Sequence, residues 1–191
     1  MLGQIRRFNR IKRDSEPKES AISVLAEIAT DRMTRLLSLL LAFGFALSTA
    51  GAQPTIFIVR HAEKADTAGE NPELSEVGRT RAEALANLLK DANITAIYTT
   101  EFKRTQETAA PLAKATGITP VSVPAKDTAT LAAKLRDAKG NILVVGHGNT
   151  IPDLLKALGI SASVNIGDSD YNELFLVVLD GTARLIHLHY H

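Results

Sequence analysis

The stretch Thr55-Ile-Phe-Ile-Val-Arg-His-Ala-Glu-Lys64 is an apolar, largely β-branched run that ends abruptly in charged and polar side chains. Such a run is typical of a strand inside a parallel sheet, because both faces of that strand are covered. Ligands of open α/β sheets bind beyond the carboxyl ends of the strands. The stretch therefore predicts an α/β fold, and it places the first candidate site residues, Arg60 and His61, at the edge where chemistry would occur.

Short apolar runs alternate with helical patterns along the rest of the chain. The expected strands are 55–59, 96–100, 121–123 and 141–145, and the expected helices are 75–89, 102–115, 128–138 and 151–158. This alternation predicts a mainly parallel central sheet that is covered by helices on both faces. Two closing runs flank Asp180-Gly181 and predict a C-terminal hairpin, with strands at 174–179 and 183–190.

The helical pattern between Ser75 and Leu89 is amphipathic. Ser75 is a suitable N-cap, and Val77, Leu85, Leu88 and Leu89 fall near one face. We therefore expect these four apolar side chains to pack against the sheet.

Residues 33–52 have the three-part layout of a secretory signal peptide. A short positive start, Met33-Thr-Arg35, precedes the apolar stretch 36–47, and small residues follow as far as a cut after Ala52. The alternative is a buried N-terminal helix of the domain. The apolar stretch is shorter than the roughly 20 residues of a spanning helix. We therefore expect a periplasmic or secreted domain, residues 53–191, with no stable membrane span in its mature form.

Residues 1–32 differ from the signal-like segment, because a cluster of arginines and lysines is followed by acidic residues. One hypothesis is that Met33 is the true start and that 1–32 is an over-extended reading frame; another is that 1–32 is a disordered arm. A basic arm for nucleic acid or for a membrane surface is a further alternative.

Charge and composition exclude several classes of protein. The chain has 191 residues, a formal net charge of +1 and no cysteine, which rules out a disulfide framework, a thiolate metal site and a cysteine nucleophile. Residues 1–52 hold eight Lys/Arg and five Asp/Glu, so residues 53–191 hold 14 and 16. A mildly acidic domain gives little electrostatic affinity for nucleic acid, and we expect no such partner.

Four chemically active side chains follow the expected strands. They are Arg60, His61, Arg104 and His147. Each has an ordinary structural explanation by itself, but the topology brings all four to one edge of the sheet. Guanidinium groups present a planar fork of donors that matches phosphate oxygens and remains charged. The four residues together therefore predict a phosphate site.

The two histidines and two arginines suggest a division of labour. A neutral imidazole attacks phosphorus, and nearby guanidinium charge would lower the pKa of His61 and keep that ring unprotonated. His61 is then the nucleophile, and hydrolysis proceeds by formation and breakdown of a phosphohistidine. His147 donates to the phosphoryl group, with Asn149 as a supplementary donor. Because Arg60 and Arg104 supply the positive charge, we expect neither a metal ion nor another cofactor.

Four sequence motifs contain these residues and occur in a specific order. They read Ile58-Val-Arg-His-Ala-Glu-Lys64, Leu74-Ser-Glu-Val-Gly-Arg79, Tyr98-Thr-Thr-Glu-Phe-Lys-Arg-Thr-Gln-Glu-Thr-Ala109 and Val144-Val-Gly-His-Gly-Asn-Thr150. In this order they resemble the histidine phosphatase superfamily, also called phosphoglycerate-mutase-like. The resemblance covers most of residues 55–178. It implies a three-layer α/β/α sandwich, with His61 as the phosphorylated nucleophile and Arg60, Arg104 and His147 as the phosphate pocket.

The sequence departs from the family pattern at the proton donor. Ala62 stands where the family has glycine, and Gly148 stands where the acid-phosphatase branch has its aspartate donor. The mutase-like branch carries a glutamate acid in an inserted segment, but here the region 121–140 is short and offers only Asp127 and Asp137. Asp127 is our candidate general acid.

Several polar residues near the motifs are candidates for substrate contacts. Lys64 and Glu101 would bind substrate. Glu101 and Glu63 are also alternatives to Asp127 as the acid, or they would orient Arg104 or Lys64 through ion pairs. Glu173 and Asp170 would rim the pocket. The closing residues His187, His189 and His191 share one strand face; a metal site there is an alternative to a solvated face, which we favour.

The sequence thus predicts a metal-independent phosphatase that hydrolyses a phosphomonoester through a phosphohistidine on His61. The expected partner is a phosphorylated small molecule or a phosphorylated envelope component. The alternative is a non-catalytic, phosphate-binding envelope module of the same fold. His61 separates the two, because a binding module needs no nucleophile in line with the phosphate.

Overall fold

The computed structural model describes residues 23–36, 53–67 and 69–191. The chain divides into two units, 1–51 and 52–191. In the first unit, residues 23–36 form a solvent-exposed helix, and an ion pair of 2.9 Å joins Arg35 to Asp31. Of residues 1–32, only 23–32 are described, and they belong to this helix; the segment contains good helix formers such as alanine, leucine and glutamate.

Most of the predicted signal peptide lies outside the described residues. Only residues 33–36 are described, as the last turn of that helix, and 37–52 are not. Among the described helices, none combines the length and the apolar character that crossing a membrane requires.

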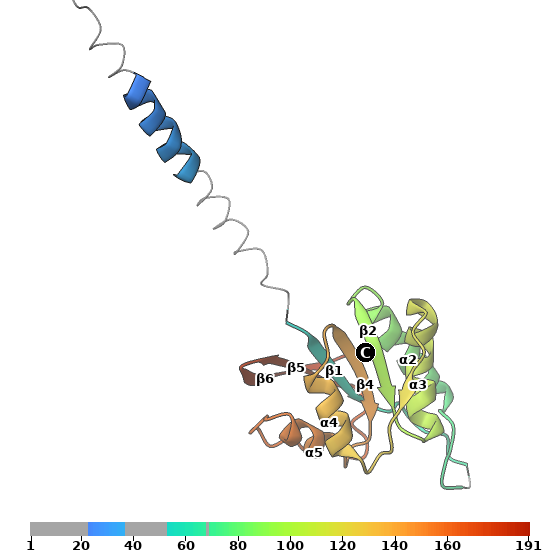
Figure 1. Ribbon diagram of the computed structural model, residues 1–191. Coiled ribbons are helices and arrows are strands. Elements are labelled where there is room, and N and C mark those ends of the chain that lie inside the picture. The colour runs from blue at the N-terminus through green and yellow to red at the C-terminus, as the bar shows by residue number, and fades with distance from the viewer. Residues whose placement is uncertain (1–22, 37–52, 68) are drawn as a thin grey trace, which may run out of the picture. The chain divides into compact units, whose positions relative to one another are not determined.

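The second unit is built on a six-stranded sheet with the order β3-β2-β4-β1-β5-β6 (Figure 1). Its strands are β1 (Thr55–Arg60), β2 (Ile94–Thr99), β3 (Val121–Ser122), β4 (Asn141–Gly146), β5 (Glu173–Asp180) and β6 (Thr182–His189). Strands β1, β2, β3 and β4 are parallel to one another, whereas β5 runs antiparallel to β1, and β6 antiparallel to β5. The mainly parallel sheet and the C-terminal hairpin are as predicted.

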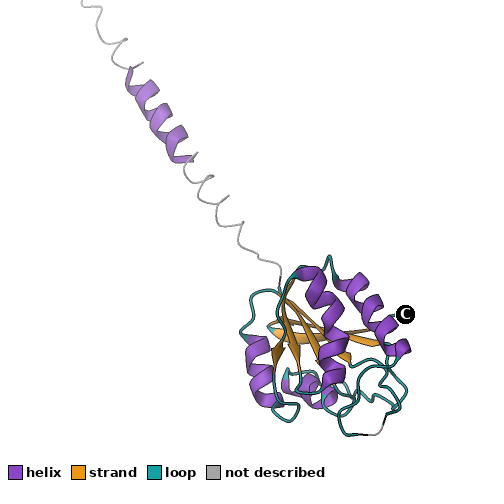
Figure 2. Ribbon diagram, turned by 90° about the vertical axis from the view of Figure 1, so that its right-hand side faces the viewer, coloured by secondary structure: helices purple, strands orange, loops and turns teal. Residues whose placement is uncertain are grey.

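Helices cover both faces of this sheet (Figure 2). They are α2 (Glu76–Leu89), α3 (Lys103–Thr116), α4 (Thr128–Arg136) and α5 (Ile151–Ala157). The apolar side chains of α2 and α3 pack on one face, and those of α4 and α5 pack on the other. The three-layer α/β/α sandwich is therefore confirmed.

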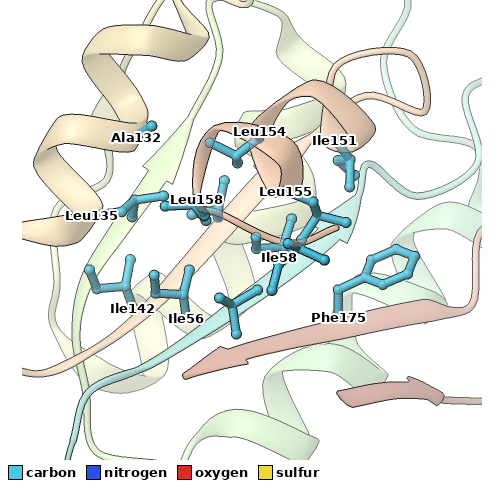
Figure 3. Close-up of a cluster of buried hydrophobic side chains, with 13 residues drawn as sticks. Ile56, Ile58, Ala132, Leu135, Ile142, Ile151, Leu154, Leu155, Leu158 and Phe175 are labelled. Atoms are coloured by element: carbon cyan, nitrogen blue, oxygen red, sulfur yellow. The ribbon is translucent and has the colours of Figure 1, made fainter. Parts of the chain in front are cut away.

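Strand β1 supplies both halves of the core because its side chains alternate between the two faces. Ile56 and Ile58 join the cluster under α4 and α5, which also contains the fully buried Phe175 (Figure 3). Val59 belongs to the cluster under α2 and α3. Each fully buried side chain of this kind contributes about 1.5–3 kcal/mol to stability. The burial of β1 on both faces fixes the position of the residues that follow it.

The buried face of α2 differs from the expected one. Leu85 and Leu89 are buried, but Val77 and Leu88 are about half exposed or more. The core-facing positions are filled mainly by small residues, namely Gly78, Ala82 and Ala86. An apolar pattern that weights large side chains misses such a face, because close packing of α2 against its neighbours selects small side chains instead.

Gly78 shows why the buried face of α2 carries small side chains. A Cβ atom at this position would lie 2.2 Å from the backbone oxygen of Glu63. That oxygen also accepts a hydrogen bond of 2.9 Å from the Ser75 amide, and the Ser75 hydroxyl accepts from the Gly78 amide at 3.1 Å. The start of α2 is therefore packed directly on the loop that follows His61.

We expect Gly78→Ala to lower the free energy of unfolding by about 3 kcal/mol, because the added methyl group overlaps backbone atoms. Helix propensity alone predicts the opposite sign, a gain of about 1 kcal/mol. Urea unfolding measures the change. Asn87→Ala, on the exposed face of the same helix, is the matched control and should change stability by less than about 0.5 kcal/mol. A Gly78→Ala protein as stable as the wild type would contradict this account of the packing.

Candidate active site

The structure brings the two predicted histidines together at the carboxyl edge of the sheet. β1 and β4 are neighbours with Arg60 opposite Gly146, so the residues that follow the two strands leave the sheet side by side. The His61 amide donates to the Gly146 oxygen at 2.9 Å. The imidazole centroids of His61 and His147 are 5.3 Å apart. Both rings are nearly buried.

His61 is held in one tautomer. Its Nδ1 lies 2.8 Å from the Ala62 carbonyl oxygen, which only accepts, so Nδ1 carries the proton and Nε2 keeps its lone pair. The Ala62 amide in turn donates to the Thr108 hydroxyl at 2.9 Å, and that hydroxyl donates to the Arg104 carbonyl. Thr108 is fully buried and therefore joins the end of β1 to α3.

Burial is the largest cause that lowers the pKa of His61 from 6.5 to about 4. The hydrogen bond to Ala62 opposes this shift, and the charges of His147, Arg104 and Arg60 add to it. The expected direction is correct, but the sequence argument named the guanidinium groups as the cause. The larger cause is the removal of water, which depends on how the chain packs around the ring.

His147 has a similar environment. Burial lowers its pKa from 6.5 to about 4, with a further lowering by Arg104 and an opposing effect of Glu101. Its Nε2 lies 3.0 Å from the Thr100 hydroxyl and its Nδ1 lies 3.5 Å from Nη2 of Arg104. Because a guanidinium only donates, Nδ1 accepts in this arrangement and Nε2 donates to Thr100.

In the phosphate-free protein, the imidazole signals of His61 and His147 should titrate with midpoints near pH 4 rather than 6.5. Both rings stay neutral at pH 6 and gain protons only as the pH falls through about 4. Because the unfolded chain takes up these protons near pH 6.5, the pair lowers the free energy of unfolding as the pH falls from 6.5 toward 4. Nitrogen-15 NMR of the rings checks this; a midpoint near 6.5 for His61 would contradict it.

The guanidinium groups of Arg60 and Arg104 are held by different contacts. Arg60 is 9% exposed; its Nη1 donates to the Gly167 oxygen, and its guanidinium carbon lies 4.3 Å from the Tyr171 ring centroid. Its Nε is buried and has no hydrogen-bond partner. Arg104 lies over the Phe102 ring, with its guanidinium carbon 4.4 Å from the centroid. Burial, followed by the charge of Arg60, lowers the pKa of Arg104. The pocket therefore brings two guanidinium charges close together, which favours an anion.

Arg60, His61, Lys64 and Arg104 line one cavity of about 340 Å³. Its outer wall is the loop after Lys64, with lining residues Ala65, Asp66, Thr67, Gly69, Glu70 and Pro72. No sequence motif marks Asp66 and Glu70, so their carboxyl groups were not predicted to lie at the site. Tyr171 was not predicted either, because it reaches Arg60 only through the tertiary fold.

Four other predicted site residues lie outside this lining. One is His147, which still lies beside His61 and Arg104, with 5.3 Å between the imidazole centroids and 3.5 Å between its Nδ1 and Nη2 of Arg104. Asp127 caps α4, with its Oδ1 accepting from the Thr130 amide at 3.2 Å, and it borders a separate, small cavity. Glu101 accepts a hydrogen bond of 2.8 Å from the Ala125 amide and acts on Arg104 and His147 through its charge. Asn149 is exposed on the turn after His147.

Glu63 forms an ion pair, but not with Lys64. Its carboxylate accepts from Arg81 on α2, with 2.6 Å between Oε1 and Nη2. This bond holds the pKa of Glu63 below its usual value, against the effect of burial. The pair joins the loop after His61 to α2 and leaves Lys64 facing the cavity.

Comparisons with known proteins agree with this architecture. The family model described as histidine phosphatase superfamily (branch 1) matches residues 56–126, which include Arg60, His61 and Arg104. No curated protein matches the sequence.

Several solved structures share the fold. The protein histidine phosphatase SixA, solved with tungstate, is 19% identical with a TM-score of 0.61, over 71% of this chain and 96% of that one. A mycobacterial glucosyl-3-phosphoglycerate phosphatase is 18% identical with a TM-score of 0.58, over 72% and 99%. A putative α-ribazole-5′-phosphate phosphatase from Escherichia coli is 15% identical with a TM-score of 0.60, over 72% and 96%.

The fold and the pocket define an α/β sandwich in which two histidines and two arginines meet at the carboxyl edge of a mainly parallel sheet. The family model matches residues 56–126 and the solved structures share the fold, so this part of the chain is similar to the histidine phosphatase superfamily, the phosphoglycerate-mutase-like proteins. The family match supports a phosphatase activity in general.

Proposed function

We propose that this protein is a phosphatase that hydrolyses phosphomonoesters through a phosphohistidine on His61. One observation carries the proposal: a buried, neutral imidazole keeps the lone pair on Nε2, because its Nδ1 proton is bound to the Ala62 carbonyl. A purely structural histidine does not need a free nitrogen beside two guanidinium groups. Arg60, His61 and Arg104 line the same cavity, so a phosphate held by the arginines lies within reach of that nitrogen.

The reaction proceeds in two displacements. In the first, Nε2 of His61 forms a bond to phosphorus while the bond from phosphorus to the ester oxygen breaks, and the alcohol leaves. In the second, water attacks the phosphohistidine, the bond from phosphorus to Nε2 breaks, and inorganic phosphate is released. Arg60 and Arg104 stabilise the charge on the phosphoryl oxygens in both steps. His61 returns to its starting tautomer.

His147 takes a proton as the substrate arrives. Its pKa is about 4 in the empty pocket, so its ring is neutral at pH 7. A phosphate dianion placed beside the ring favours the charged form and raises that pKa. The protonated ring then donates from Nδ1 to a phosphoryl oxygen, while Nε2 remains bound to the Thr100 hydroxyl.

The proton for the leaving alcohol comes from the outer wall of the cavity. Asp66 and Glu70 line the cavity with His61, whereas Asp127, the candidate from the sequence, faces a different cavity and caps a helix. A leaving group that is stable as an anion needs no such donor. We therefore expect phenyl phosphates with acidic phenols to be turned over fastest, and Lys64 to assist by contacting the substrate.

The substrate we propose is a phosphorylated small molecule or a phosphorylated component of the cell envelope, and the location is periplasmic or secreted. The signal-like layout of residues 33–52 supports the location. The similar structures are named for a protein phosphohistidine, a phosphorylated sugar acid and a ribazole phosphate. The same fold therefore acts on different substrates, and the loops around the pocket determine which substrate is bound.

The purified full-length protein, incubated with p-nitrophenyl phosphate and a panel of sugar phosphates, tests the function. We expect turnover that survives EDTA, inhibition by vanadate, and a phosphoryl adduct that is labile in acid and stable in alkali. The absence of both turnover and adduct, with inorganic phosphate still bound, would favour the non-catalytic binding module instead.

A further inference from the structure

A second group of ligating side chains lies on the C-terminal hairpin, outside the cavity that contains His61. Glu173 begins β5 and pairs directly with His189 of β6, and His187 lies two residues before His189 on the same face. Potential ligand atoms of the three residues all lie within 4.8 Å of one another. The sequence pattern places only the histidines of the closing strand together, because the strand register that adds the carboxylate is a property of the folded hairpin.

One carboxylate oxygen of Glu173 has no hydrogen-bond partner among the described residues. The side chain is 10% exposed, and its Oε2 is buried without any hydrogen bond. Its Oε1 lies 3.6 Å from Nε2 of His187, which is longer than a good hydrogen bond. A buried carboxylate is stable only when it is paired, hydrogen-bonded or bound to a metal ion. A bound cation would give the unpartnered oxygen a ligand contact.

The two imidazoles are already placed for a shared ligand. The His187 ring stacks on Phe175, with 4.5 Å between centroids, and Phe175 is completely buried. The His189 ring lies 4.9 Å from that of His187. A ring stacked on the core keeps its orientation, so little side-chain entropy is lost when a ligand binds.

We propose that Glu173, His187 and His189 bind one divalent transition-metal ion of the zinc type. Two imidazole nitrogens and one carboxylate oxygen are a donor set that zinc prefers, with a fourth position left for water. The ion neutralises the buried carboxylate and fastens the edge strand β6 to β5. This site is separate from the phosphatase proposal, since no step of phosphoryl transfer uses it.

The position of this site also connects it to the phosphate pocket. Leu174 pairs with Val59, so Glu173 lies beside the end of β1, where Arg60 begins the site. The loop that precedes β5 carries Gly167 and Tyr171, the two residues that hold the Arg60 guanidinium. Metal binding at Glu173 therefore fixes the end of that loop.

Calorimetric titration of the metal-free, full-length protein with Zn²⁺ tests the proposal. We expect saturable binding at this site, and expect His187→Ala, His189→Ala and Glu173→Gln each to weaken the affinity by more than tenfold, because loss of even an outer-shell partner weakens metal sites by about 10–100-fold. Glu173→Gln keeps the size of the side chain, and circular dichroism confirms that each variant is folded. Substitution with Co²⁺ should give ligand-field bands that disappear in the same variants.

The control for specific Zn²⁺ binding is the other pair of neighbouring imidazoles, those of His61 and His147. The double variant His61→Ala, His147→Ala should retain the affinity for Zn²⁺. Three outcomes would overturn the proposal: no binding by the wild type, binding that survives both single histidine variants on β6, or binding that is lost only in the double variant. The readout is binding and not turnover, so a failure of the phosphatase proposal leaves this test unaffected.

Discussion

Replacement of His61 by alanine should lower kcat/KM for p-nitrophenyl phosphate by about 10⁴-fold or more and should abolish the phosphoryl adduct. The variant loses the Nε2 atom of His61, whose lone pair is free because the other ring nitrogen, Nδ1, is bound to the Ala62 carbonyl. Arg60 and Arg104 remain, so phosphate binding should persist even though transfer stops. Steady-state kinetics and isolation of the radiolabelled adduct measure the two effects.

His191→Ala is the matched control for this substitution. It removes the same side chain from an exposed position at the chain end and should leave kcat/KM unchanged. His61→Ala should also keep the fold, because the hydrogen bond from the residue 61 amide to Gly146 belongs to the backbone. A His61→Ala protein that retains a tenth or more of the wild-type activity would exclude His61 as the nucleophile.

Arg104→Ala should lower kcat/KM by about 10³-fold, since an arginine that stabilises a transferring phosphoryl group contributes about 10³–10⁵. Its guanidinium lies close to His147 and near Arg60, so one charge of the pocket is lost together with a hydrogen bond to the imidazole. We also expect vanadate to bind more weakly. Arg104→Lys should restore only part of the activity, because an ammonium keeps the charge but lacks the planar fork.

The neighbouring cation is a suitable control for Arg104. Lys103 is exposed and pairs with Glu73 at 3.0 Å, so Lys103→Ala changes the net charge equally but leaves the cavity lining intact. The kcat/KM of Lys103→Ala should stay within about twofold of the wild-type value, as expected for the loss of a solvated ion pair. Equal losses in Lys103→Ala and Arg104→Ala would mean that general charge, and not a placed guanidinium, supports the reaction.

Local sequence was enough to predict most of the secondary structure. The apolar run that ends at Val59, the N-cap at Ser75 and the left-handed Gly117 after α3 are recognisable in a one-dimensional pattern. The buried face of α2 is not recognisable in this way, because Gly78 and its alanine neighbours face the core through close backbone contact. A pattern based on large apolar residues cannot register a contact with the Glu63 carbonyl.

The sequence also predicted part of the candidate site. Arg60, His61, Arg104 and His147 follow strand ends, and the rule that parallel strands end at one edge brought them together correctly. Asp127 also follows a strand, but its carboxylate is used to cap α4. Asp66, Glu70 and Tyr171 belong to loops without motifs, and only the folded chain shows that they reach the pocket or Arg60.

The sequence by itself determined the layered fold, the edge of the sheet that holds the site and the four residues that meet there, because periodicity and strand polarity are encoded locally. Only the tertiary structure decided the tautomer and low pKa of His61, the support of Arg60 by Tyr171 and the approach of Glu173 to the closing histidines. Burial, hydrogen-bond partners and strand register depend on which segments distant in the chain pack side by side. No local pattern contains that information.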